Sequence, residues 1–213
     1  MKKNKELYLM IGIGAFFLFC LLTILLTFDT GVIAPSGGQV GLSHINNLVK
    51  YKENNTADKI SDVFFYASFL AVVYAVVLGI YQLIKEKSLK KVDKDIIIFG
   101  IFLVIAVGIW LLFDKFLVIN ARPLNVNEGS YPSTHVFLTT FFMLSGHMML
   151  TKRFDNKIVK YGTLAAAIIF IIVVFILRVV AGKHYITDVC GGLLLGLSFY
   201  FIVFGIDKKI SRN

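Results

Sequence analysis

Long apolar segments dominate this sequence of 213 residues and decide what it can fold into. A helix needs about 20 mainly apolar residues to cross the hydrocarbon core of a membrane, which is about 30 Å thick. Six segments reach or approach that length: 7–28, 63–84, 96–113, 134–150, 161–177 and 189–206. Because lipid offers the backbone no hydrogen-bond partners, these segments should be helical. The sequence therefore predicts an all-α, six-transmembrane-helix bundle that forms a single membrane domain over residues 1–213, with one long outer loop at 29–62.

Composition excludes the other broad classes. The chain is 57% hydrophobic and 16% charged, whereas soluble domains are about 45–50% apolar and about 25% charged. Its 20 Phe and 9 Tyr residues also argue against disorder. The first apolar run is too long for the core of a signal peptide, and no cleavage site follows it, so we expect a retained helix. The loop 29–62 is expected to lie on the membrane surface or to act as a lid.

The distribution of Lys and Arg predicts the orientation. Fifteen of the 22 basic residues lie at the two termini and in the second and fourth loops, against seven in the other loops. Since cytoplasmic loops carry the basic excess, both termini should be cytoplasmic. The short, compact chain favours a bacterial plasma membrane. No basic stripe with interleaved aromatic residues is present, so we expect membrane lipids as partners and no nucleic acid.

Several cations and imidazoles stand out because they lie in outer loops, where basic residues should be rare. They are Lys115, Arg122, His135, Arg178 and His184. Each has an ordinary explanation when taken singly: Lys115 as an interfacial anchor, His135 as a packed histidine, and His184 as one partner of an i,i+4 pair with Asp188. All of these explanations would have to hold at once on the same membrane face. A shared function is therefore favoured.

The residue types suit a phosphoryl group. Three cations, Lys115, Arg122 and Arg178, can contact its oxygens. The backbone N–H groups of Ser133, Thr134 and His135 open a helix, and a helix N-terminus attracts anions. Such donors stabilise the charge that develops on the equatorial oxygens during phosphoryl transfer.

Two histidines complete the chemistry. His184, beside Asp188, is a candidate nucleophile whose tautomer a carboxylate would fix. His135 remains as the proton donor for the departing oxygen. The outer carboxylates are too scattered along the sequence to hold Mg²⁺, so the scheme requires neither a metal nor another cofactor.

Three segments together resemble the motif of the type 2 phosphatidic acid phosphatase superfamily. They are Lys115-x6-Arg122-Pro123, Pro132-Ser133-Thr134-His135 and Arg178-x5-His184-x3-Asp188. The resemblance implies that His184 forms a phosphohistidine, that Asp188 orients it, and that His135 protonates the leaving group. It also implies that Lys115, Arg122, Arg178 and Ser133 hold the phosphate without a metal. The superfamily usually has Gly at position 134 and Ser at position 177, where this chain has Thr134 and Leu177. The Thr134 amide and hydroxyl remain available to phosphate.

The expected function is that of an integral membrane lipid phosphatase whose site faces the exterior. The implied substrates are lipid phosphomonoesters or diphosphates such as phosphatidate, phosphatidylglycerophosphate, polyprenyl diphosphate or lipid A phosphates. A phosphotransferase on the same scaffold would use the same first step and would be recognised by an acceptor-dependent product. A non-catalytic lipid-phosphate binder or transporter would need the cations but not the nucleophile.

Overall fold

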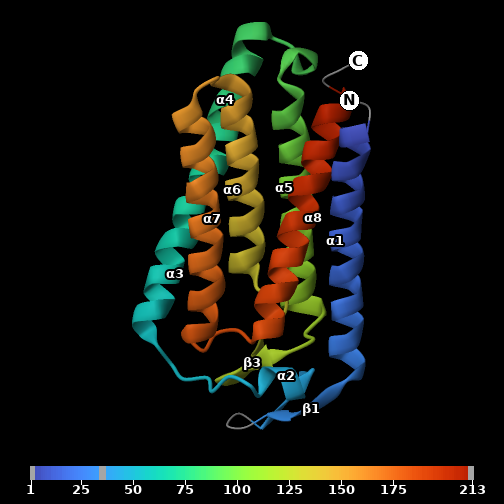
Figure 1. Ribbon diagram of the computed structural model, residues 1–213, viewed down its shortest axis with the longest axis vertical. Coiled ribbons are helices and arrows are strands. Elements are labelled where there is room, and N and C mark those ends of the chain that lie inside the picture. Colours follow the sequence, from blue (N-terminus) through green and yellow to red (C-terminus); the bar gives the residue numbers. More distant parts are fainter. Residues whose placement is uncertain (1–2, 34–36, 211–213) are drawn as a thin grey trace.

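Long helices form the body of the protein, and two short hairpins lie at one end (Figure 1). The computed structural model describes residues 3–33 and 37–210. The long helices are α1 (Lys3–Phe28), α3 (Asn55–Ser68), α4 (Leu70–Glu86), α5 (Lys94–Leu111), α6 (Thr134–Arg153), α7 (Lys157–Val180) and α8 (Ile186–Ile210). The start of α1 and the end of α8 lie at the end of the bundle away from the hairpins.

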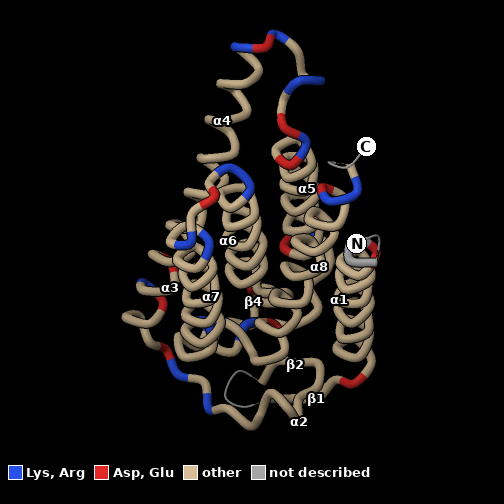
Figure 2. The backbone as a smooth tube through the Cα atoms, turned by 45° about the horizontal axis from the view of Figure 1, so that its top comes forward, with Lys and Arg blue, Asp and Glu red and all other residues tan. Residues whose placement is uncertain are grey.

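Within the described residues, five segments are long and apolar enough to cross a membrane. They are Glu6–Phe28, Asn55–Glu86, Lys94–Phe116, Lys157–Val180 and Ile186–Ile210. Their outward faces carry exposed apolar side chains such as Met10, Leu70, Val104 and Ile158. Figure 2 shows that the charged residues gather near the helix ends, while the middle stretches are almost entirely uncharged. This pattern is typical of helices that face lipid.

Helix α6 covers the predicted segment 134–150, but it is not among the five segments that are apolar enough to cross a membrane. Within the described residues, five of the six predicted spans therefore qualify by length and composition. The reason is the place of α6 in the bundle. α6 packs against α3, α4, α5, α7 and α8, and most of its side chains are buried. A helix surrounded by protein can carry Thr, Ser and Gly where a lipid-facing helix would carry larger apolar residues.

The predicted outer loop 29–62 contains regular structure. β1 (Thr30–Ile33) and β2 (Gly38–Gly41) pair antiparallel, with Thr30 opposite Gly41, and the short helix α2 (Ser43–Asn46) follows. α3 begins at Asn55, well before the predicted start at 63, because the Asn54 side chain caps it by accepting a hydrogen bond from the Ala57 amide at 3.0 Å. Residues 55–62 are therefore helical.

A second hairpin, β3 (Ala121–Arg122) and β4 (Asn125–Gly129), lies beside the first one, so the fold is mainly rather than wholly α-helical. Between α5 and β3 the chain forms a π-helical turn, Leu112–Phe116. α8 packs closely against the start of α6, and this is possible because Gly192 has no side chain. A Cβ atom at Gly192 would lie 2.5 Å from the Ser133 carbonyl oxygen. This contact fixes the beginning of α6 next to the beginning of α8.

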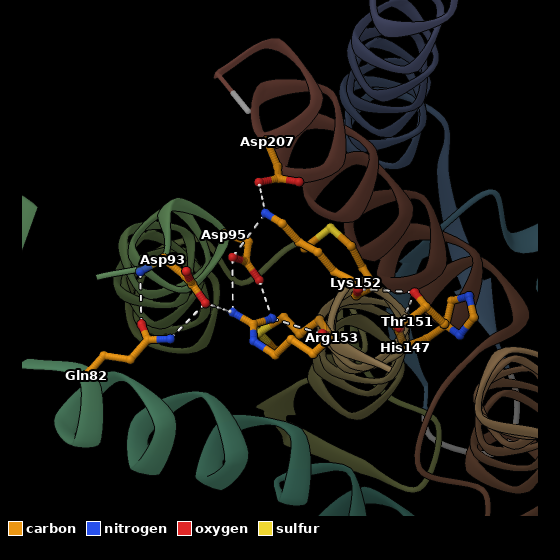
Figure 3. A network of polar contacts seen from close by, with 10 residues as sticks. Gln82, Asp93, Asp95, His147, Thr151, Lys152, Arg153 and Asp207 are labelled. Carbon is orange, nitrogen blue, oxygen red and sulfur yellow. Dashed lines mark hydrogen bonds and ion pairs between the residues drawn. The ribbon is translucent and has the colours of Figure 1, made fainter. Parts of the chain in front are cut away.

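An ion network ties the helices together at the end of the bundle away from the hairpins (Figure 3). Asp95 is fully buried and pairs with Arg153 at 2.7 Å and with Lys152 at 3.2 Å. Lys152 also pairs with Asp207, and Arg153 with Asp93, each at 2.7 Å. Gln82 of α4 donates to Asp93 at 2.8 Å. The network therefore connects α4, α5, α6 and α8.

Candidate active site

A cavity of about 420 Å³ opens at the hairpin end of the bundle. Its walls come from the α3–α4 junction, α5 with its π-helical turn, the second hairpin, the start of α6 and the turn before α8. The lining residues are Phe65, Phe69, Trp110, Phe113, Asp114, Arg122, Gly129, Ser130, Tyr131, Pro132, Thr134, His135, Leu138 and His184. One side of the cavity is thus aromatic and apolar, and the other carries the polar groups.

His184 lies in the turn between α7 and α8 and is 4% exposed. Gly182 makes this turn possible with a φ of +71°, and the His184 amide donates to the Arg178 carbonyl at 3.2 Å. The imidazole Nδ1 lies 2.9 Å from the Ser130 carbonyl oxygen, which can only accept, so Nδ1 carries the proton. Nε2 is then the nitrogen with a lone pair.

The environment keeps His184 neutral. Burial lowers the pKa of His184 well below its ordinary value, and the positive charges of Arg178 and Arg122 lower it further. A neutral imidazole with a free Nε2 is the form that a nucleophile requires.

Asp188 lies near His184 but makes its hydrogen bonds elsewhere. Its Oδ2 is 3.9 Å from His184 Nδ1, beyond hydrogen-bond distance. The carboxylate instead accepts from the Asn120 side-chain amide and from the Tyr185 backbone amide, each at 2.8 Å. The Ser130 carbonyl therefore makes the hydrogen bond that the sequence assigned to Asp188. Asp188 holds the turn and the hairpin segment around the histidine.

His135 stands in the first turn of α6 and also lines the cavity. Its Nε2 lies 3.0 Å from the Asp62 Oδ1 atom. The ring packs on Phe65, with centroids 4.1 Å apart. Both contacts come from α3, so this helix sets the orientation of the imidazole.

Arg178 lies at the end of α7 and is almost fully buried. Its Nη1 donates to Asp58 at 2.7 Å and to Asp62 at 3.4 Å. Within the described part of the chain, its Nε atom is buried and has no hydrogen-bond partner. A second cation, Lys183, pairs with the other oxygen of Asp58 at 3.3 Å. Two carboxylates of α3 thus neutralise much of the positive charge on this side.

Arg122 reaches the cavity from β3. Its Nε pairs with Glu128 at 3.1 Å, and the Glu128 side chain is 53% exposed. Arg122 also lines a smaller pocket of about 270 Å³, together with Glu53, Lys183 and Gly182. Arg122 therefore contributes to both pockets.

Ser133 and Thr134 form the N-terminal end of α6. Ser133 Oγ is buried and, among the residues described, has no hydrogen-bond partner. Thr134 lines the cavity, and the non-glycine residues of the described chain with positive φ are Leu42 and Lys87. The β-branched residue at 134 thus needs no left-handed backbone.

Lys115 differs from the expectation that three cations meet at one point. It lies in the π-helical turn, its Nζ pairs with Asp114 at 2.7 Å, and its side chain is 65% exposed. Asp114, and not Lys115, lines the cavity. Lys115 therefore does not line the cavity that Arg122, His135 and His184 share.

Sequence reasoning missed Asp58, Asp62, Asn120 and Ser130. Asp58 and Asp62 fall within the predicted loop 29–62, although their i,i+4 spacing is the signal for two carboxylates on one helix face. Ser130 contributes its backbone carbonyl, which no side-chain pattern reveals. Asn120 is a polar residue directly before the second hairpin, and its role depends on contacts distant in sequence.

Comparison with known proteins gives three similarities. Residues 112–212 match the family model of the PAP2 superfamily. Phosphatidylglycerophosphatase B of Bacillus subtilis (strain 168) is 32% identical over 127 residues, which cover 53% of this chain and 60% of that relative. The crystal structure of a transmembrane PAP2 type phosphatidylglycerolphosphate phosphatase from Bacillus subtilis superimposes with a TM-score of 0.60, at 20% identity, and covers 94% of this chain and 98% of that one. At that identity the likeness concerns the fold.

Proposed function

We propose that this chain, whose residues 112–212 match the family model of the PAP2 superfamily, is an integral membrane phosphatase that hydrolyses a lipid phosphate through a phosphohistidine. One observation carries the proposal. His184 Nδ1 lies 2.9 Å from the Ser130 carbonyl, which leaves Nε2 as the nucleophilic nitrogen, and His184 lines the same cavity as His135 and Arg122. A nucleophile, a proton donor and a guanidinium thus share one space.

Two buried donors lie next to this cavity without lining it, and they support an anion there. Ser133 precedes the lining residue Thr134, and Arg178 contacts Asp62, the partner of His135. Ser133 Oγ and Arg178 Nε are unpaired in the described structure, although a buried donor without a partner costs free energy. Phosphate oxygens would satisfy both. The N-terminal end of α6 adds the amide of Thr134 and its dipole.

The chemistry follows from these positions. The lone pair of His184 Nε2 forms a bond to phosphorus while the bond to the alcohol oxygen breaks, and His135 gives that oxygen a proton. Water then attacks the phosphohistidine, His135 takes one proton from this water, and inorganic phosphate leaves. The charge is stabilised by protein donors, so we expect activity without added metal.

The cavity walls favour a lipid substrate. Phe65, Phe69, Trp110, Phe113 and Leu138 form an apolar side next to the polar groups, which suits a phosphate carried by acyl chains. The names of the two Bacillus relatives make phosphatidylglycerophosphate the first substrate to test. We propose a bacterial plasma membrane, with both termini cytoplasmic and the site outside. The start of α1 and the end of α8 lie at the end of the bundle opposite the cavity, which supports this orientation (Figure 1).

The test is phosphate release by the purified protein from phosphatidylglycerophosphate, phosphatidate and polyprenyl diphosphate, with EDTA present. We expect release from at least one of them, none from His184→Ala, and an acid-labile phosphoprotein in the wild type after rapid quenching. Binding without phosphate release would indicate a lipid-phosphate binder. Release that requires a second alcohol would indicate a phosphotransferase. Loss of activity with EDTA would refute the metal-free scheme.

A further inference from the structure

Asp62 lies on α3, far in sequence from the three motifs, yet it contacts two of their side chains. Its Oδ1 is 3.0 Å from His135 Nε2 and 3.4 Å from Arg178 Nη1. The Asp62 side chain is 38% exposed, and that of His135 is 22% exposed. The pair is thus partly shielded from water, where a charge-assisted hydrogen bond is stronger than at an open surface.

Burial opposes the protonation of His135 most strongly, and together with the positive charges of Arg178 and Arg122 it lowers the pKa of His135 to about 3. Arg178 approaches from α7 and Arg122 from β3, and His184 lies across the cavity. Phe65 covers the ring from α3. Asp62 places a carboxylate against the imidazole at 3.0 Å, so it works against this lowering and favours the imidazolium form that a proton donor needs.

Asp58, one helical turn earlier, has a different set of partners. Its two oxygens pair with Arg178 at 2.7 Å and with Lys183 at 3.3 Å. No contact between Asp58 and His135 occurs in the described structure. The two carboxylates of α3 therefore divide their contacts: Asp58 anchors cations, and Asp62 also reaches the histidine.

We propose that Asp62 is the positioning residue for His135. It accepts the Nε2 proton and fixes the ring so that Nδ1–H is the donor to the leaving oxygen. When the phosphorus–oxygen bond breaks and the bond to His184 forms, the leaving alkoxide takes the Nδ1 proton. His135 becomes neutral and keeps its Nε2–H on Asp62. The inference rests on the proposed phosphatase function.

The leaving group distinguishes this role from a structural one. An alkoxide needs a proton as it departs, whereas 4-nitrophenolate is a weak base and departs without one. We would compare kcat/KM, which reports the steps through alcohol release, for dioctanoyl phosphatidate and 4-nitrophenyl phosphate. Asp62→Asn should lower kcat/KM for phosphatidate by about 10- to 100-fold, part of the full contribution of a general acid. For the aryl phosphate the loss should be much smaller.

Asp58→Asn is the matched control, because it weakens the hold on Arg178 without touching His135. It should lower kcat/KM for both substrates by the same factor. Asp62→Glu keeps the carboxylate and should retain the wild-type ratio of the two kcat/KM values. Because each ratio is measured on one preparation, it does not depend on the fraction of protein that is folded.

Equal losses on both substrates in Asp62→Asn, with an active wild type, would overturn the role of Asp62 and leave the proposed function intact. The same selectivity in Asp58→Asn would also overturn it. A wild-type protein that releases phosphate from neither substrate would refute the phosphatase function itself.

Discussion

Replacing Asp95 by Asn tests whether the ion network opposite the active site holds the bundle together. Asn keeps the size of the side chain and one acceptor oxygen but removes the charge. Asp95 is fully buried and accepts hydrogen bonds from Arg153 at 2.7 and 3.2 Å and from Lys152 at 3.2 Å. Three charge-assisted contacts between α5 and α6 are therefore weakened by one substitution (Figure 3).

The expected loss in the free energy of unfolding depends on the ion pairs that remain in the variant. Removing one partner of a buried ion pair costs about 3–5 kcal/mol. In Asp95→Asn, Arg153 keeps Asp93 and Lys152 keeps Asp207, and the Lys152 side chain is 36% exposed and can regain water. We therefore expect a loss of about 2–3 kcal/mol in the free energy of unfolding. For a chain of this size that loss lowers Tm by about 5–10 °C.

The assay is the loss of helical circular dichroism on heating in detergent. Glu86→Gln is the control, because Glu86 pairs with Lys91 at 3.1 Å while both side chains are far more exposed than Asp95. That pair should contribute less than about 1 kcal/mol. If Asp95→Asn and Glu86→Gln shift Tm equally, the network does not stabilise the bundle in the way described.

Three further predictions concern the site. His184→Ala should abolish phosphate release, and His135→Ala should lower it by about 10²- to 10⁴-fold, with unchanged circular dichroism in both. Wild-type activity in His184→Ala would contradict its role. Because burial lowers the pKa of His184 below 6.5, the acid limb of kcat/KM should lie below pH 6.5. The unfolded chain binds this proton more readily, so stability should also fall as pH drops below about 6.5; a midpoint of the acid limb above 6.5 would argue against a neutral nucleophile. Gly192→Ala should lower both Tm and activity, since its methyl group would meet the Ser133 carbonyl at 2.5 Å; an unchanged Tm would show that α8 can move away from α6.

The helices could be predicted because their cause is local. Runs of apolar residues of membrane-spanning length identify helices wherever they occur, and the structure has a helix at each of the six predicted segments. The helix ends depend on other forces. The Asn54 side chain starts α3 at Asn55, ahead of the apolar run, so hydropathy alone set the boundary too late. The hairpins also escaped prediction, because residues 30–33, 38–41 and 121–129 are too short to show a repeating pattern.

The parts of the site that could be predicted are those whose residues lie within about one helical turn of each other in the sequence. His184 and Asp188 lie close together, and Ser133, Thr134 and His135 open a helix, as their positions in sequence require. Contacts between distant segments were not predictable. The orientation of Lys115 depends on a π-helical turn, and the partners of Asn120 come from β2 and α8. In these cases the tertiary arrangement selects the partner, so no local pattern contains it.

The carboxylates around the site change how its cations should work. Arg178 is paired with Asp58 and Asp62, and Arg122 with Glu128, before any phosphate arrives. A fully unpaired cluster of cations would hold the product phosphate as firmly as the substrate, and such uniform binding does not speed the reaction. Paired guanidiniums bind a resting phosphate less strongly, because each contact must compete with a carboxylate. Their attraction grows when charge builds up on the equatorial oxygens in the transition state, and that difference accelerates the chemistry. If the proposed phosphatase function holds, we expect the two acids of α3 to promote the release of phosphate after each turnover.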